Sequence, residues 1–358
     1  MPAALKPLSA QTMVITGATS GLGLAIARLA AAKGAKLLLA ARNEQALRAL
    51  CEELHARGGV AAYVAADVAE EAQVRAVAAR ADALYGGFDT WINNAGIGIY
   101  GKLGETPVED QRRLFDTNYW GMVNGSLVAA EHLRARPGGG ALINIGSVLS
   151  DVPIPTQGAY SASKHAMKGF TNALRMELMR EAPQIAVTLV KPGALDTPYR
   201  EHARNFTGAA MKNPPPVYAT PLAAEAVLYA AAHRTREITV GGFGWILTVA
   251  NQVAPALLEP MLAFAVPLLS RGGEDTTATG GDALHKAGRG LRERVPYFGV
   301  RETSLFTKAQ MNPQTTIPAL FAAGAAAGLA LMAFDALRLH RVRSEARRKL
   351  RAELKAKG

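Results

Sequence analysis

The chain has 358 residues, of which 49% are hydrophobic and 19% are charged, and this composition indicates a folded protein with at least one large core. Its single cysteine, Cys51, excludes an intrachain disulfide and any metal site built from several cysteines. The net charge of +11 would favour a nucleic-acid partner, but residues 335–358 carry +6 of it, so we expect no nucleic acid. We also expect no bound metal.

The first eleven residues are short, mixed and contain two prolines, so they do not have the pattern of a signal peptide. We therefore expect the first domain to be cytoplasmic. Residues 12–16 then predict a strand, and residues 24–32 have an apolar helical pattern.

Between this strand and this helix lies the turn Gly17-Ala18-Thr19-Ser20-Gly21-Leu22-Gly23. Strand, glycine turn and helix is the order that a pyrophosphate site requires. Glycines let the backbone approach the phosphates, and the start of the helix offers unpaired N–H groups. A glycine turn alone is weak evidence, because it is often only a tight connection.

Arg42 directly follows a second predicted strand, residues 36–41. In a dinucleotide fold this position faces the adenosine ribose, where an acid would bind the 2′-hydroxyl and an arginine suits a 2′-phosphate. Arg42 therefore favours NADP over NAD. The alternative is an ordinary arginine at the start of the helix predicted over residues 43–57.

Strands and helices continue to alternate, with a strand over residues 60–65, a helix over 70–85 and a strand over 89–92. This alternation predicts an α/β fold with a doubly wound parallel sheet of about seven strands and helices on both faces. Ligands then bind at the carboxyl ends of the strands. Asp67 and Asn94 fall at such ends, although each could instead be a helix cap or a turn former.

Tyr160 and Lys164 are four residues apart, and Ser147 lies thirteen residues before Tyr160. On a helix this spacing places the phenol and the ammonium group on one face. A neighbouring positive charge favours the phenolate and lowers the pKa of the tyrosine, which makes the pair a usable proton donor and acceptor. The same spacing also occurs by chance on many surface helices.

Six motifs in one order make the chain resemble the short-chain dehydrogenase/reductase family from about residue 12 to residue 242. They are Thr16-Gly17-x-x-x-Gly21-x-Gly23, Asn93-Asn94-Ala95-Gly96, Asn118, Ser147, Tyr160-x-x-x-Lys164 and Pro192-Gly193. The resemblance implies a Rossmann-type fold and an NADP-dependent oxidoreductase that interconverts a secondary alcohol and a ketone or aldehyde.

The resemblance also implies a role for each catalytic residue. Tyr160 would exchange a proton with the substrate oxygen as general acid or base, and Ser147 would hydrogen-bond the same oxygen. Lys164 would hold the nicotinamide ribose and lower the pKa of Tyr160. Asn118 would support a water chain to solvent; without the resemblance it would be a buried polar residue that satisfies backbone groups.

For the cofactor, the resemblance implies contacts along six segments of the chain. A homodimer or homotetramer is a possible assembly. The contacting residues would be Gly17, Ser20, Gly21, Leu22, Gly23, Arg42, Asp67, Val68, Asn94, Ala95, Gly96, Tyr160, Lys164, Pro192, Gly193 and Thr197. Two segments would determine substrate specificity, residues 149–157 and 197–217. Both are rich in apolar residues, which favours an apolar alcohol or carbonyl compound; the alternative is that they only cover the core.

The last third predicts an extension, so that the domains are a catalytic domain over 1–242, an apolar helical segment and polar arm over 243–316, and an apolar helix with a basic tail over 317–358. Residues 243–269 predict an interrupted helix over the substrate entrance or on a membrane surface. Residues 270–314 predict an extended arm with little fixed structure.

Residues 317–334 carry no charge. As a helix they would be ~27 Å long, barely the ~30 Å of a hydrocarbon core. We expect peripheral or re-entrant attachment of this region to the cytoplasmic face of a membrane, with the basic tail on anionic lipid. A full span is a second possibility, but on its own it would place the basic tail and the nucleotide domain on opposite sides. A helix that docks on protein is the alternative.

The sequence allows two other functions. An isomerase or lyase that keeps NAD(P) tightly bound is disfavoured by the spacing Gly17-x-x-x-Gly21-x-Gly23. A membrane-associated, non-catalytic nucleotide sensor would need none of the residues that move a proton.

Overall fold

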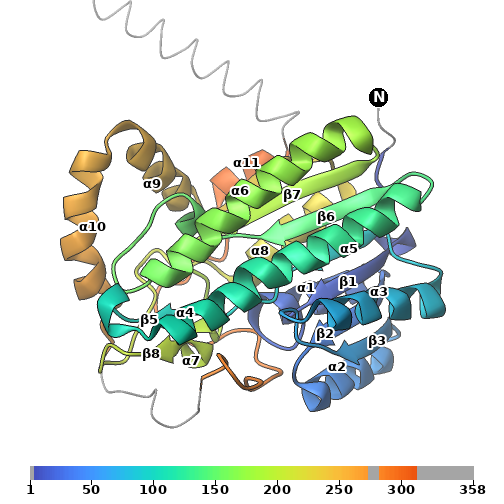
Figure 1. Ribbon diagram of the computed structural model, residues 1–358, viewed down its shortest axis with the longest axis horizontal. Helices are drawn as coiled ribbons and strands as arrows, with labels where there is room; N and C mark the ends of the chain where they lie inside the picture. Colours follow the sequence, from blue (N-terminus) through green and yellow to red (C-terminus); the bar gives the residue numbers. More distant parts are fainter. Residues whose placement is uncertain (1–3, 273–281, 313–358) are drawn as a thin grey trace, which may run out of the picture. The chain divides into compact units, whose positions relative to one another are not determined.

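A seven-stranded parallel sheet forms the centre of the protein (Figure 1). The structure is a computed structural model that describes residues 4–272 and 282–312. The strand order is β3-β2-β1-β4-β6-β7-β9. The strands are β1 Thr12–Thr16, β2 Lys36–Ala41, β3 Val60–Ala65, β4 Thr90–Asn93, β6 Gly140–Ile145, β7 Ile185–Pro192 and β9 Glu237–Val240. The order reverses between β1 and β4, so a ligand crevice is expected at the carboxyl ends of these strands.

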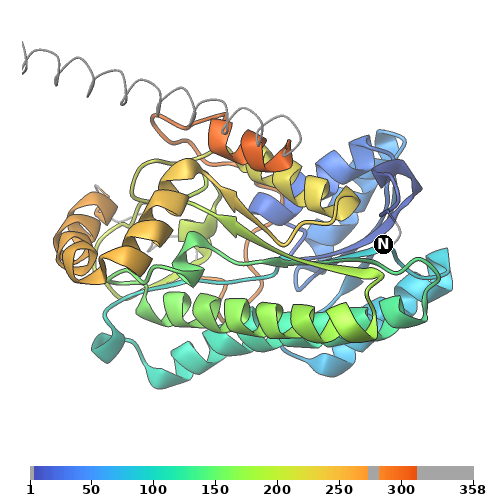
Figure 2. The same cartoon turned by 90° about the horizontal axis from the view of Figure 1, so that it is seen from above.

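Helices cover both faces of the sheet, as predicted (Figure 2). The first face carries α1 Gly21–Ala32, α2 Glu44–Ala56 and α8 Thr220–Ala232, and the second carries α3 Glu71–Tyr85, α5 Gly121–Ala135 and α6 Gly158–Glu181. All five residues of β1 are buried, as in a strand that is covered on both faces. Trp91 on β4 packs between the strands and the second helix layer in the main core.

Between β4 and α5 the chain forms a small outlying region at the carboxyl end of the sheet. It contains β5 Ile99–Tyr100, α4 Val108–Phe115 and a π-helical turn, Asp116–Trp120. β5 pairs in parallel with β8 Arg204–Asn205, which follows the short helix α7 Tyr199–His202. Single 3-10 turns lie at Leu8–Ala10, Leu103–Glu105 and Val148–Ser150.

The described part of the extension begins with two helices, α9 Gly242–Val253 and α10 Pro255–Ser270, which pack on each other. They meet at Ala254, so the interruption expected in residues 243–269 lies there. A compact unit of the chain ends at Thr307, within the last described helix, α11 Leu305–Met311. Residues 243–272 and 282–307 therefore pack in one unit with the sheet, while the predicted domain boundaries at 242 and 316 stay predictions.

Within the described ranges, no helix combines the length and the apolar character needed to cross a bilayer. The predicted apolar helix 317–334 and the basic tail lie outside the described residues.

Candidate active site

The glycine turn that links β1 to α1 is so closely packed that side chains would not fit. Gly17 has a φ of +66°, and a Cβ atom there would lie 2.7 Å from the Cα atom of Ala95. A Cβ atom on Gly23 would lie 2.1 Å from the carbonyl oxygen of Gly17. This turn and the start of α1 form a cradle in which backbone N–H groups can reach a phosphate.

Asn94 fixes this cradle from the neighbouring strand. Its Nδ2 donates hydrogen bonds to the carbonyl oxygens of Thr16 and Gly17, at 3.0 and 3.1 Å. The Oγ1 of Thr16 in turn accepts from the backbone N–H groups of Asn94 and Ala95. The ends of β1 and β4 are thereby tied together, and the amide of Asn94 serves the turn itself.

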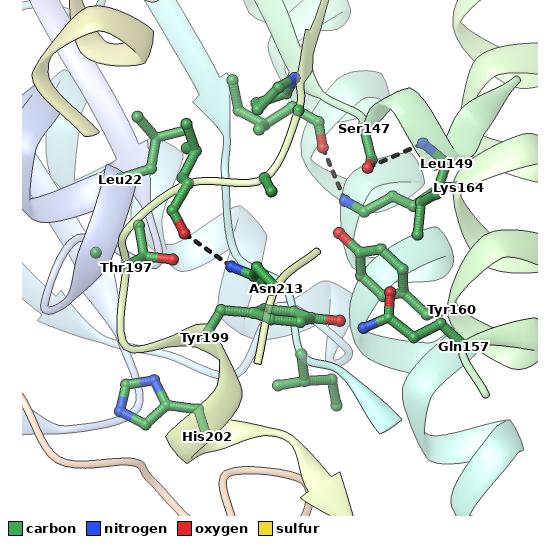
Figure 3. Close-up of a pocket in the computed structure, with 18 of the residues that line it drawn as sticks. Leu22, Ser147, Leu149, Gln157, Tyr160, Lys164, Thr197, Tyr199, His202 and Asn213 are labelled. Carbon is green, nitrogen blue, oxygen red and sulfur yellow. Dashed lines mark hydrogen bonds between the residues drawn. The ribbon is translucent and has the colours of Figure 1, made fainter. Parts of the chain in front are cut away.

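Ser147, Tyr160 and Lys164 converge beside this cradle (Figure 3). The Nζ of Lys164 lies 5.5 Å from the centre of the Tyr160 ring and donates to the carbonyl oxygen of Ile145 at 2.8 Å. The Oγ of Ser147 accepts from the backbone N–H of Leu149 at 3.0 Å, which leaves its own proton for another acceptor. A proton donor, a hydroxyl and an amine thus lie in one place.

Burial dominates the electrostatics of this group. It raises the pKa of Tyr160 to about 12, although the neighbouring hydroxyls of Ser147 and Tyr199 act in the opposite direction. It also lowers the pKa of Lys164 to about 7. The expectation that Lys164 makes Tyr160 a stronger acid is therefore wrong for the net shift in this structure, because desolvation of the phenolate outweighs the favourable contributions.

Asn118 lies in the π-helical turn and does not line the cavity that contains the other predicted residues. Its Oδ1 accepts from the N–H of Ile97, and its Nδ2 donates to the carbonyl oxygen of Ile97 and to the Oγ of Ser163. These bonds satisfy backbone groups, which is what the sequence alone suggested. The water-chain role stays a prediction.

At the adenosine end, Arg42 and Asp67 have partners that the sequence did not reveal. Asp67 forms an ion pair with Arg113 of α4. The guanidinium group of Arg42 donates to the carbonyl oxygens of Ala283 and Leu284, and the Nε of Arg113 also donates to Leu284. Arg42 therefore lines the cavity where a 2′-phosphate was expected, and Arg113 shares the carbonyl oxygen of Leu284 with it.

Residues 282–295, which we call the strap, run along the mouth of the nucleotide cradle. The backbone N–H of Gly21 donates to the carbonyl oxygen of Arg292 at 2.8 Å, and that of Leu291 donates to Thr19 at 2.7 Å. Leu284 is fully buried against Ile97, Ile99 and Leu114. The expectation of little fixed structure in this arm is wrong here, because backbone bonds and one buried leucine hold it.

A single cavity of about 500 Å³ joins these parts. Its lining includes Ser147 and every residue predicted to bind the cofactor: Gly17, Ser20, Gly21, Leu22, Gly23, Arg42, Asp67, Val68, Asn94, Ala95, Gly96, Tyr160, Lys164, Pro192, Gly193 and Thr197. The glycine cradle at the start of α1 and the guanidinium group of Arg42 fit a dinucleotide, since they offer close backbone approach and positive charge to phosphates.

The other end of the cavity is apolar. Phe243 and Leu247 of α9 and Leu258, Leu262 and Val266 of α10 line it. The two predicted specificity segments contribute as well, residues 149–157 through Leu149, Ile154 and Gln157, and residues 197–217 through Thr197, Tyr199, His202 and residues 213–216. The sequence predicted these residues either over the substrate entrance or on a membrane surface, and in the structure α9 and α10 form one wall of the cavity.

Known proteins resemble this chain along most of its length. A family model described as short chain dehydrogenase matches residues 11–207. An uncharacterized oxidoreductase of Bacillus subtilis, YxnA, is 39% identical over 314 residues, which cover 86% of this chain and 87% of the relative. The chain belongs to the short-chain dehydrogenase/reductase family. It is an NAD(P)-dependent oxidoreductase of that family.

Solved structures of the same family support the fold. A short-chain dehydrogenase/reductase from Burkholderia phymatum in complex with NAD has a TM-score of 0.65 and 27% identity, over 71% of this chain and 97% of that one. A gluconate 5-dehydrogenase from Burkholderia cenocepacia in complex with NADP and tartrate has a TM-score of 0.58 and 27% identity, over 67% and 96%. The neighbours bind either nucleotide.

The match to YxnA is longer than the predicted catalytic domain of 242 residues, so the similarity continues into the extension. The two solved structures are matched almost entirely, yet they leave more than a quarter of this chain uncovered. This short-chain dehydrogenase/reductase therefore shares part of its extension with YxnA.

Proposed function

We propose that the chain is an NADP-dependent oxidoreductase that interconverts a secondary alcohol and a ketone or aldehyde, with Tyr160 as general acid or base. The observation that carries the proposal is the meeting of Ser147, Tyr160 and Lys164 in the same cavity as the glycine cradle. When bound, the nicotinamide supplies or accepts the hydride. The chain's own residues then bind, orient and move one proton.

Each polar group has one task in this proposal. The hydroxyl proton of Ser147 is free to bind the reacting oxygen of the substrate, since its Oγ already accepts from Leu149. Tyr160 gives its proton to that oxygen in reduction and takes it back in oxidation. Lys164 holds the ribose next to the nicotinamide, and Asn118 holds the backbone at Ile97 while supporting a path for the proton.

Arg42 supports the preference for NADP. Its guanidinium group and the carboxylate of Asp67 line the adenosine end of the cavity. Arg113 is paired with Asp67 and donates to the same Leu284 carbonyl oxygen as Arg42. Two guanidinium groups can bind a 2′-phosphate with charge-assisted hydrogen bonds. An NAD enzyme would instead need an acidic residue at the position of Arg42 to accept from the 2′-hydroxyl.

The apolar end of the cavity supports an apolar alcohol or carbonyl substrate. The outer surfaces of α9 and α10 expose further large apolar side chains, Trp245, Ile246, Leu257, Phe264 and Leu268. They support our proposal that these helices rest on the cytoplasmic face of a membrane, from which a lipophilic substrate enters. Flotation with anionic vesicles measures membrane binding, and Phe264→Asp should reduce the fraction of protein that floats.

Exposed apolar side chains on a second surface support a homodimer or homotetramer. Leu127 of α5 and Met176 and Met179 of α6 are each at least half exposed, as is Trp120 before α5. Light scattering of the purified protein measures the assembly. A monomer at micromolar concentration would contradict this part of the proposal.

The decisive experiment follows NADPH absorbance with a panel of apolar ketones. Tyr160→Phe should reduce turnover by about 10²- to 10⁴-fold, because it removes the proton donor. NADPH binding, measured by fluorescence, should change little. A Tyr160→Phe variant that turned over normally would refute the proposed function.

A further inference from the structure

The hydroxyl group of Tyr199 is buried in the site and makes no hydrogen bond of good geometry with the described residues, although it lies close enough to the Tyr160 hydroxyl to lower the pKa of Tyr160. Buried hydroxyl groups nearly always have a partner, because leaving one unpaired is costly. Tyr199 lines the cavity, and its ring meets the ring of Tyr160 edge-on with the centres 5.4 Å apart (Figure 3). The unpaired hydroxyl therefore lies beside the proposed proton donor.

The surrounding backbone holds the Tyr199 side chain in this place. A Cβ atom on Gly98 would lie 2.2 Å from the Oη of Tyr199, so only glycine leaves room for the hydroxyl there. The N–H of Arg204 donates to the carbonyl oxygen of Gly98 at 3.0 Å, and that of Phe206 donates to Tyr100 at 2.7 Å. These are the bonds of the β5–β8 pair, so the two sides of the contact are tied together.

Tyr199 is suited to donate a hydrogen bond and poorly suited to lose its proton. Burial raises its pKa well above the ordinary value, and the nearby phenols of Tyr160 and Tyr100 add to the effect. The other titratable groups around the pair are Lys164 on α6 and His202 on α7, and burial lowers the pKa of each.

We propose that Tyr199 is a positioning residue that donates a hydrogen bond to the oxygen of Tyr160 when Tyr160 is ionised. Without substrate the hydroxyl of Ser147 lowers the pKa of Tyr160. When substrate is bound, the single proton of Ser147 goes to the substrate oxygen, and Tyr199 on α7 then supplies the donor to the Tyr160 oxygen. In reduction the proton of Tyr160 passes to the substrate oxygen, while Tyr199 keeps its own proton throughout. The inference rests on the proposed function, since it assigns a support to the proton donor named there.

The test measures the pKa of Tyr160 in the NADP⁺-saturated protein. The nine tyrosines are labelled with ¹³C at Cζ, and the resonance that is missing in Tyr160→Phe identifies Tyr160. Tyr199→Phe should raise the pKa of Tyr160 by about one unit, as expected for the loss of one hydrogen bond to a charged oxygen. The rising limb of alcohol oxidation against pH should move upward with it.

Two further variants separate this role from a merely structural one. Gly98→Ala places a methyl group at the Tyr199 hydroxyl and should raise the pKa of Tyr160 in the same direction. Tyr100→Phe removes a neighbouring hydroxyl that donates to Asn213 and not to Tyr160. This variant should leave the pKa of Tyr160 unchanged.

An unchanged pKa of Tyr160 in Tyr199→Phe would overturn the inference, whatever happened to KM. A loss in kcat/KM without a pKa shift would mean that Tyr199 contacts the substrate instead. Failure of the proposed function is a separate result, because it shows as normal turnover by Tyr160→Phe.

Discussion

The two walls of the active-site cavity are built in different ways. The wall at the carboxyl ends of β1, β4 and β6 is made by glycines, by bonds between strand ends and by side chains on the first turns of α6. The wall formed by α9, α10 and the strap is made by backbone carbonyl groups and apolar side chains. The first wall carries the chemistry of the family, and the second decides what can reach it.

The largest expected effect concerns Lys164 in the first wall. Its pKa is about 7 in the folded chain and 10.5 ordinarily, so between these values the unfolded chain holds a proton that the folded chain lacks. The contribution of Lys164 to stability therefore improves as pH rises through this window and is least favourable below pH 7. The unfolding free energy of the parent should gain about 2–5 kcal/mol from Lys164 as the pH rises from 6 to 11. Lys164→Met should lack this gain.

Urea unfolding at the two pH values measures this difference. Lys33→Met, at an exposed position after α1, is the control and should show little change with pH. A stability difference for Lys164→Met that does not depend on pH would mean that burial does not perturb this amine.

The next effect tests whether the strap retains the cofactor. Leu284→Asp places a carboxylate where a leucine is fully buried, so the strap should detach from Ile97 and Leu114. The dissociation rate of NADPH should then rise at least about tenfold. Burying a leucine side chain contributes about 1.5–3 kcal/mol, and a tenfold change in rate corresponds to about 1.4 kcal/mol. Stopped-flow fluorescence measures the rate.

Phe298→Asp, at a fully exposed position of the extension, is the matched control and should leave the rate unchanged. If both variants released NADPH at the parental rate, the strap would not be a wall for the cofactor.

Arg42 links the two walls. It follows β2 of the same sheet, and its guanidinium group donates to two carbonyl groups of the strap. Arg42→Ala should weaken NADPH binding about tenfold more than NADH binding, as expected when a charge-assisted hydrogen bond to the 2′-phosphate is lost. Arg48→Ala, an exposed arginine on α2, should have no such effect. Equal losses for both nucleotides would assign Arg42 to the strap alone.

The smallest effect separates the two surfaces of α10. Leu258 lines the cavity and is 6% exposed, whereas its neighbour Leu257 is 73% exposed. Leu258→Ala should lower kcat/KM for 2-decanone about three- to tenfold by removing apolar contact, and Leu257→Ala should not. The reverse order would place the substrate outside the predicted cavity.

The sequence was informative where local spacing determines geometry. The seven-stranded sheet follows from the alternation of strands and helices. The order strand, glycine turn and helix predicted the cradle, and Gly17 and Gly23 meet other atoms there so closely that no side chain would fit. Tyr160 and Lys164 are one helical turn apart, so their proximity was predictable.

The second wall was not predictable because its contacts join distant residues without a periodic pattern. Arg42 and Ala283 are 241 residues apart, and the strap contributes carbonyl oxygens that every residue type possesses. The sequence placed Tyr199 only within the predicted specificity segment, residues 197–217. Its place beside Tyr160 depends on the pairing of β5 with β8, two strands of two residues each. The direction in which the pKa of Tyr160 shifts also depends on burial, which the sequence spacing of Tyr160 and Lys164 does not reveal.

The most direct test of the account follows a deuterium atom. The protein is incubated with an apolar ketone and, separately, with each of the two NADPH forms deuterated at C4 of the nicotinamide. The account predicts that one form transfers its deuterium to the carbinol carbon of the alcohol product, and that Tyr160→Phe forms almost none of this product. Product that contains no deuterium from either form, with the cofactor unchanged at the end, would contradict net hydride transfer to the substrate.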